Sequence, residues 1–135
     1  MITTFLIGAI IFGIIVMILL NRLGRRFARP INRGYFERKW TELLGRVKTT
    51  EGMMLAVIDA DKLLDDALKK KGYKGKTMGE RLVAAQRDFS NNDSVWYAHK
   101  LRNRLVHEPD TRLRRGEAKN ALAGIRQALK DLGIL

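Results

Sequence analysis

The residues best suited to chemistry in this chain are concentrated in one stretch, Trp96–Pro109, which reads WYAHKLRNRLVHEP. Both histidines of the protein, His99 and His107, lie in it, together with Arg102 and Asn103. A planar guanidinium can bind a phosphate through two parallel hydrogen bonds, and an imidazole can exchange a proton near neutral pH. These side chains are therefore the candidate functional residues.

A helix over this stretch would have two distinct faces. On a wheel of 100° per residue, the core-facing arc of about 140° comprises Val95, Ala98, Leu101, Leu105 and Val106. Arg102 falls inside that arc, so its guanidinium must be paired, reach the surface or lie at an interface. The adjacent arc carries Trp96, His99, Asn103 and His107. Lys100 and Arg104 take the remaining, solvent-facing side.

A purely structural role would account for the same residues. Asn103 would tie the helix to a neighbouring backbone, and His107 would cap the helix end. Arg102 would pair with Asp61 or Asp65, which lie one turn apart at the edge of another predicted apolar stripe. Two such carboxylates can form an acid–base or metal pair, but they more often pair with basic neighbours, which are abundant in this chain.

The composition gives little support to metal chemistry. The chain has no cysteine, which excludes disulfides and cysteine-ligated zinc. Its two histidines are separated by eight positions and no HExxH pattern is present, so they form a poor ligand set. We therefore predict neither a metal nor another cofactor.

The N-terminal segment Met1–Leu20 contains no charged residue and is apolar on all sides. A helix of about 20 residues rises about 30 Å, close to the hydrocarbon thickness of a bilayer. A cleaved signal peptide would carry its basic residues before the apolar run, whereas Arg22, Arg25 and Arg26 follow it. We predict a single-pass transmembrane helix over residues 1–21, anchored in the cell membrane. The positive-inside rule then places the C-terminal domain in the cytoplasm.

The charge is strongly basic and unevenly distributed. The chain has 26 Lys and Arg residues against 14 Asp and Glu, a net charge of +12. Residues 22–49 read as a basic juxtamembrane segment followed by a short helix over Tyr35–Val47. Attraction of such a flank to anionic lipid is its simplest use. A tether to a membrane surface or nucleic acid through charge alone is a further candidate function.

The rest of the chain, residues 50–135, shows helical periodicity throughout. The strongest helix prediction is Glu51–Lys71, which has one apolar stripe: Met53, Ala56, Val57, Ala60, Leu63, Leu64, Ala67 and Leu68. A capping box at Thr77–Glu80 opens another helix, Pro109 ends the one described above, and the last runs over Glu117–Leu132. No run alternates with a period of two residues. The fold class is therefore all-α, with an antiparallel bundle of four to five helices after the transmembrane helix.

The residue pattern of the central stretch resembles that of a known protein family. Arg102–His107 reads R-N-x-x-x-H and lies in the penultimate long helix of a small helical domain. Within the longer frame W-x-A-H-K-L-R-N-x-L-V-H-E-P, this resembles the HEPN superfamily, whose hallmark is an Arg and a His a few residues apart, often with Asn after the Arg. The resemblance covers about residues 50–135. Small uncharacterised membrane-tethered bacterial proteins are also similar, including over Ala60–Asp65.

The resemblance implies metal-independent cleavage of RNA by a membrane-anchored ribonuclease. Arg102 would stabilise charge on the scissile phosphate, His107 would act as acid or base, and Asn103 would orient one of them. The binding residues would be Trp96, His99, Lys100 and Arg104, and the supporting acids Asp61 and Asp65.

One straight helix does not bring Arg102 and His107 together. They are separated by about 7.5 Å of rise and about 140° of azimuth. A homodimer would bring two copies of the pair together, as dimers of the family do. The alternative is a non-catalytic membrane-tethered module, which dimerises or binds a protein or nucleotide through the face of Trp96, His99 and Asn103.

Overall fold

The computed structural model describes the backbone of residues 2–26 and 30–135, and the side chains of residues 2–20 and 30–135. Its α-helices are α1 (Ile2–Arg26), α2 (Arg33–Gly45), α3 (Thr50–Lys71), α4 (Met78–Ala85), α5 (Asn92–His107) and α6 (Arg115–Asp131), and a 3-10 turn, η1 (Gln86–Asp88), follows α4. The described part of the chain contains no strand. The predicted all-α class is therefore confirmed.

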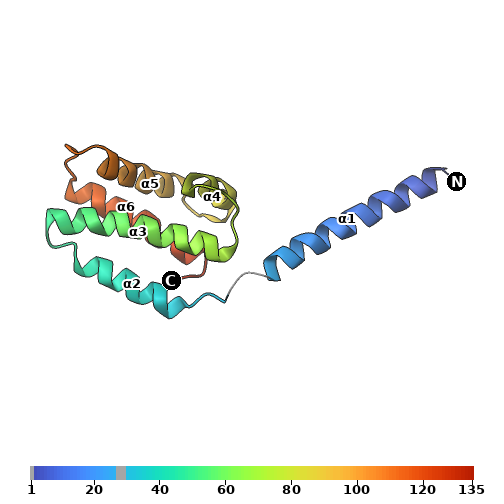
Figure 1. Cartoon of the computed structure of the whole chain (residues 1–135), viewed down its shortest axis with the longest axis horizontal. Helices are drawn as coiled ribbons and strands as arrows, with labels where there is room; N and C mark the ends of the chain where they lie inside the picture. The colour runs from blue at the N-terminus through green and yellow to red at the C-terminus, as the bar shows by residue number, and fades with distance from the viewer. Residues whose placement is uncertain (1, 27–29) are drawn as a thin grey trace.

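Helix α1 projects away from the remaining helices (Figure 1). Its segment Ile2–Leu20 is long and apolar enough to cross a membrane. Nearly all of its side chains are exposed, because no other element packs against them. This agrees with the anchor predicted over residues 1–21. Residues 27–29 of the predicted juxtamembrane segment lie outside the described residues.

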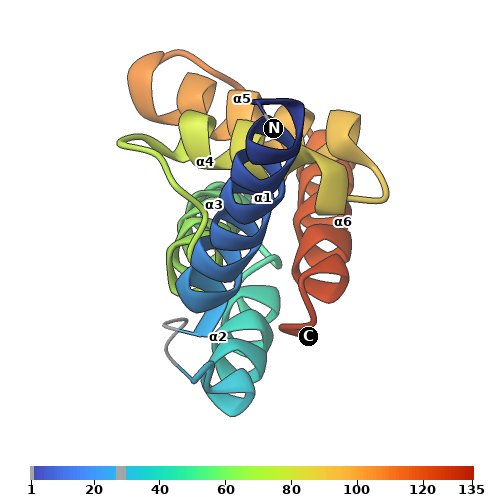
Figure 2. The same ribbon diagram turned by 90° about the vertical axis from the view of Figure 1, so that its right-hand side faces the viewer.

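Helix α3 is the central element of the bundle, with contacts to α2, α4, α5 and α6. Figure 1 shows α3 between α2 and α5, and the view in Figure 2 shows α6 beside α3. The apolar stripe predicted on α3 is buried along its whole length: Met53, Ala56, Val57, Ala60, Leu63, Leu64, Ala67 and Leu68. Apolar burial of this extent is the main force that holds such a bundle together.

Helix α2 belongs to the same core. Phe36, Trp40 and Leu43 are buried in one cluster with the apolar residues of α3, α5 and α6. The sequence prediction had grouped this helix with the juxtamembrane segment and begun the bundle at residue 50. Its start also differs from the predicted Tyr35, because the Asn32 side chain accepts a hydrogen bond from the Tyr35 backbone N–H and starts the helix at Arg33.

Polar caps set the ends of the helices that carry the site. The Thr49 hydroxyl accepts from the Gly52 backbone N–H at 3.0 Å at the start of α3, and Gly72 ends that helix with φ at +86°. The Asn91 side chain accepts from the Ser94 N–H at 3.0 Å and starts α5. At the other end, α5 stops at His107, two residues before Pro109.

Helices α5 and α6 approach each other closely at Gly124. A Cβ atom at this position would lie 2.8 Å from the Ser94 carbonyl oxygen. Only glycine therefore allows the backbones of the two helices to make this contact. The contact, together with the packing of both helices on α3, fixes how α5 is held over α3.

Candidate functional site

The site predicted on α5 begins with a hydrogen bond between α5 and α3. The Nδ1 atom of His99 lies 3.0 Å from Oδ1 of Asp61 and 3.3 Å from Oδ2. Asp61 is only 2% exposed. A buried carboxylate needs a hydrogen-bonding partner, and His99 supplies it from the neighbouring helix.

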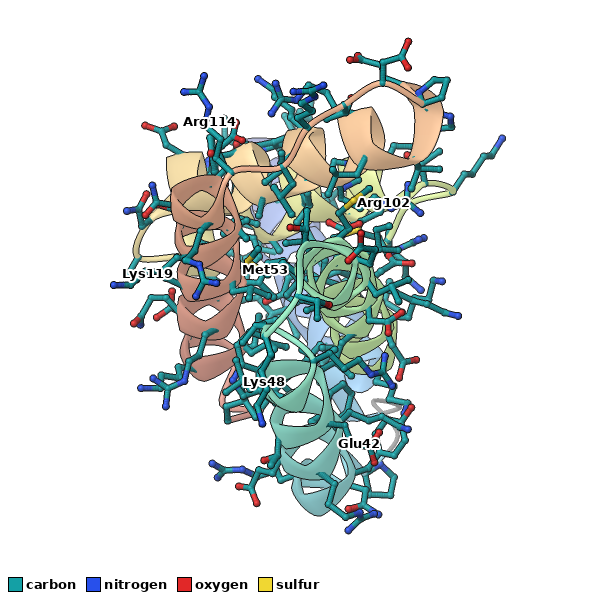
Figure 3. The ribbon with its side chains drawn as sticks, turned by 90° about the vertical axis from the view of Figure 1, so that its left-hand side faces the viewer. Glu42, Lys48, Met53, Arg102, Arg114 and Lys119 are labelled. Atoms are coloured by element: carbon teal, nitrogen blue, oxygen red, sulfur yellow. The ribbon has the colours of Figure 1, made fainter. Side chains whose placement is uncertain are left out.

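Arg102 reaches the same carboxylate from one turn further along α5. Its Nε lies 3.5 Å from Oδ2 of Asp61, within ion-pair range. That Nε is buried and makes no hydrogen bond, so the contact with Asp61 acts through charge. The sequence alternative in which Arg102 pairs with Asp61 or Asp65 is thus resolved in favour of Asp61. Figure 3 shows Arg102 at the side of the molecule where α5 passes over α3.

Asn103 closes the cluster between these two side chains. Its Oδ1 accepts a hydrogen bond from Nη1 of Arg102 at 3.0 Å, and its Nδ2 lies 3.4 Å from Nε2 of His99. Because Arg102 can only donate, the amide orientation of Asn103 is determined, and Nδ2 must donate to His99. Nε2 therefore accepts, and Nδ1 carries the proton that His99 donates to Asp61. The amide contacts side chains here, whereas the structural alternative had tied it to backbone.

Trp96 completes the polar cluster by contacting the imidazole ring of His99. Its ring meets that of His99 at a centroid distance of 6.0 Å and an interplanar angle of 76°. This edge-to-face arrangement is favourable for aromatic pairs. Trp96 and His99 are both partly buried. We name Asp61, Trp96, His99, Arg102 and Asn103 the α3–α5 polar cluster.

Asp65, the second candidate acid, belongs to a separate ion pair. Its Oδ1 accepts from Nε of Arg81 at 2.7 Å, and Oδ2 lies 2.7 Å from Nζ of Lys69. Burial raises the pKa of the Asp65 carboxyl, but hydrogen bonds from Arg81 and Lys69 outweigh burial and hold that pKa below its usual range. Arg81 also donates to the Gly75 carbonyl oxygen at 2.7 Å, which fastens the loop before α4.

His107 lies outside the α3–α5 polar cluster. It is exposed at the last position of α5, and it takes part in none of the cluster's hydrogen bonds. Val106, predicted in the core-facing arc, is 47% exposed, although Leu105 beside it is buried. Lys100 is exposed as predicted, and Arg104 pairs with Glu117 of α6 at 3.2 Å.

The cluster leaves part of Arg102 available to a ligand. Its guanidinium has five N–H donors, of which one bonds Asn103. The Arg102 side chain is 32% exposed, whereas that of Asp61 is 3% exposed. Arg102 therefore combines a fixed position with donors that face solvent. Within residues 2–20 and 30–135, no group of three His, Asp or Glu side chains is arranged to hold a metal ion.

Sequence reasoning did not identify Arg81 as a buried ion-pair partner. It is 7% exposed, although the apolar pattern of α4 gave no reason to bury it. Its partner Asp65 lies 16 residues earlier on α3, so the packing of α4 on α3 brings these two together. Gly75 lies only six residues before Arg81. The signal available in the sequence was Asp65, an acid at the edge of the apolar stripe of α3 whose only suggested partner was Arg102.

Comparison of the chain with protein-family models, curated proteins and solved structures gives no match. Function must therefore be inferred from the geometry of the site and from the sequence motif.

Proposed function

We propose that this protein is a membrane-anchored, metal-independent ribonuclease of HEPN type that acts at the cytoplasmic face of the cell membrane. Helix α1 would be the anchor, and the basic residues after Leu20 would keep the bundle on the cytoplasmic side. The bundle would present the R-N-x-x-x-H segment of α5 to RNA.

The main support for this proposal is the environment of the Arg102 side chain. Its guanidinium is positioned by Asn103 and Asp61, yet a third of the side chain is exposed and most of its donors are unused. A held guanidinium of this kind is suited to the charge that develops on a phosphate during cleavage, because it needs no reorganisation. In this proposal Asp61 and Asn103 are positioning residues.

His107 is the candidate acid or base, since the other imidazole is engaged. The Nε2 of His99 already accepts a hydrogen bond from Asn103, and its Nδ1 faces Asp61. His107 is exposed and can meet a 2′-hydroxyl or a leaving oxygen. The exposed Val106 beside it supports a second copy of α5 at this end, which would bring Arg102 of one subunit toward His107 of the other.

The test is cleavage of single-stranded RNA by the full chain in nanodiscs with a chelator present. Attack by the 2′-hydroxyl breaks the P–O5′ bond and leaves a 2′,3′-cyclic phosphate and a free 5′-hydroxyl. Arg102→Lys should slow cleavage by about tenfold or more. Lysine keeps the positive charge but lacks the planar guanidinium that donates two parallel hydrogen bonds. Intact RNA after incubation with folded wild-type protein would exclude this function.

A non-catalytic module is the second candidate, and one observation favours it. His99 bonds both Asp61 of α3 and Asn103, as expected if the cluster only locks α5 onto α3. In that case the face of Trp96, His99 and Asn103 would serve dimerisation or the binding of a protein or nucleotide. Arg102→Ala would then lower the free energy of unfolding by about 2 kcal/mol or more, and the wild type would show no RNA turnover.

A further inference from the structure

An open groove lies between the end of α2 and the first half of α6, away from the α3–α5 polar cluster. Its volume is about 690 Å³. The apolar part of its lining comes from α2, α6 and the start of α3, and Leu44 is 45% exposed there. Figure 3 views this end of the molecule, with Met53 between α6 and α3 and Lys119 on α6.

Three cations border the groove on α6. Arg115, Lys119 and Arg126 are all exposed, and all line the groove. Positions 115, 119 and 126 fall within about 40° of one another on the helix, so they form one stripe about 16 Å long. None of the residues that line the groove is acidic.

These cations differ from those of the neighbouring groove between α2 and α3. There, Lys39 pairs with Glu42 at 2.9 Å, and Arg46 pairs with Asp59 at 2.6 Å. The ion pairs found among the described residues include none of the three cations on α6. The α2–α6 groove therefore has an apolar base and an uncompensated positive border.

One residue of the groove lining has a buried polar group without a partner. Trp40 contributes to the lining, and its indole N–H is buried without a hydrogen-bond acceptor in the described part of the chain. A buried donor without an acceptor costs about 1–3 kcal/mol. That N–H is enclosed within the fold, so the kind of ligand is indicated by the apolar base and the three cations of the groove.

We propose that the α2–α6 groove binds an acidic amphipathic helix of a partner protein. Its apolar side would cover Leu44 and the groove base, and its carboxylates would face Arg115, Lys119 and Arg126. Apolar anchors at helical spacing in a groove between two helices are an established mode of recognition. A lipid headgroup fits less well, because one headgroup cannot meet three cations spread over about 16 Å.

The probe is a peptide of about 15 residues, since shorter helices are marginal in water. It carries Leu on one face and Glu along the flank, and a matched peptide carries Lys in place of Glu. Binding to the full chain in neutral phosphatidylcholine nanodiscs is measured by fluorescence anisotropy. We expect saturable binding of the Glu peptide that weakens with salt, and no saturable binding of the Lys peptide.

Variants of the groove test its specificity. Lys119→Glu combined with Arg126→Glu should weaken binding by about tenfold or more, and Leu44→Asn should do so by about tenfold through lost apolar contact. Lys130→Glu is the control, because it reverses one charge on α6 outside the groove lining, against two in the double variant. It should leave the Kd within about twofold. Circular dichroism melting confirms that each variant is folded.

Three results would overturn the proposal. The first is absence of saturable binding by the Glu peptide, and the second is an equal effect of the groove variants and Lys130→Glu. The third is binding of lysophosphatidylglycerol that depends on Lys119 and Arg126 while the Glu peptide does not compete, which would make the groove a lipid site.

Discussion

The imidazole of His99 and the carboxylate of Asp61 lie 3.0 Å apart, and this contact joins α5 to α3 in the interior of the bundle. Asp61 is also the only acid within ion-pair distance of Arg102 among the described residues. Asp61→Ala should therefore leave both partners without their carboxylate and lower the free energy of unfolding by about 3 kcal/mol.

Asp66→Ala is the matched control for that substitution. Asp66 lies on the same helix but is 39% exposed and pairs with Lys70 at 3.1 Å, so its loss should cost less than about 0.5 kcal/mol. Urea unfolding of both variants measures the difference. Equal stabilities of the two variants would show that the α3–α5 polar cluster contributes nothing to the fold.

Asp65 should contribute to the acid sensitivity of the bundle. Arg81 and Lys69 hold its folded-state pKa below the usual range, so folding is favoured by the ionised carboxylate. The stability from this group is fully present above an unfolded pKa of about 3.9. It is lost as the pH falls through the lower folded pKa.

Asp65→Asn tests this directly, because asparagine cannot ionise. The variant should be less stable than the wild type at pH 6, and the difference should shrink as the pH falls below about 4. The measurement is the free energy of unfolding by urea at a series of pH values. A difference that stays constant or grows toward low pH would contradict the assignment.

Gly124 should tolerate no side chain, because a Cβ there would lie 2.8 Å from the Ser94 carbonyl oxygen. Gly124→Ala should cost about 1–3 kcal/mol, since α5 and α6 must move apart. Gly116→Ala is the control on the same helix, with nothing within 4 Å of its Cβ position. It should be neutral or stabilising, as alanine is the better helix former. Similar melting temperatures for the two variants would argue against the close helix contact.

The predicted topology can be tested cleanly, because the chain contains no cysteine. Lys130 is exposed on α6, so Lys130→Cys introduces a single accessible thiol. If the bundle is cytoplasmic, a membrane-impermeant maleimide should label this thiol only after the cells are opened. Labelling in intact cells would place the bundle on the outside.

The helices and their core faces followed from local pattern, whereas the site depended on contacts between helices. The period of apolar residues identified the buried stripe of α3 in full, because each helix must bury one face. The same wheel placed Asp61 at the stripe edge, yet the residue is 2% exposed. What covers it is α5, whose position over α3 no local pattern specifies.

Two features of α5 could not be predicted from the helical wheel. Val106 lies in the predicted apolar arc, but a wheel does not show whether a neighbouring helix covers a given side chain. Val106 is 47% exposed, whereas Leu105 beside it is buried. The pairing of Asn103 with Arg102 and His99 also required rotamers that spacing alone does not determine.

The most direct test of the central claim is the rate of metal-free RNA cleavage by full-length His107→Ala in nanodiscs. We predict a loss of about 100-fold or more, with an unchanged melting temperature because His107 is exposed. Lys130→Ala, a remote exposed cation on α6, should retain the wild-type rate. Cleavage by His107→Ala at the wild-type rate would contradict the account.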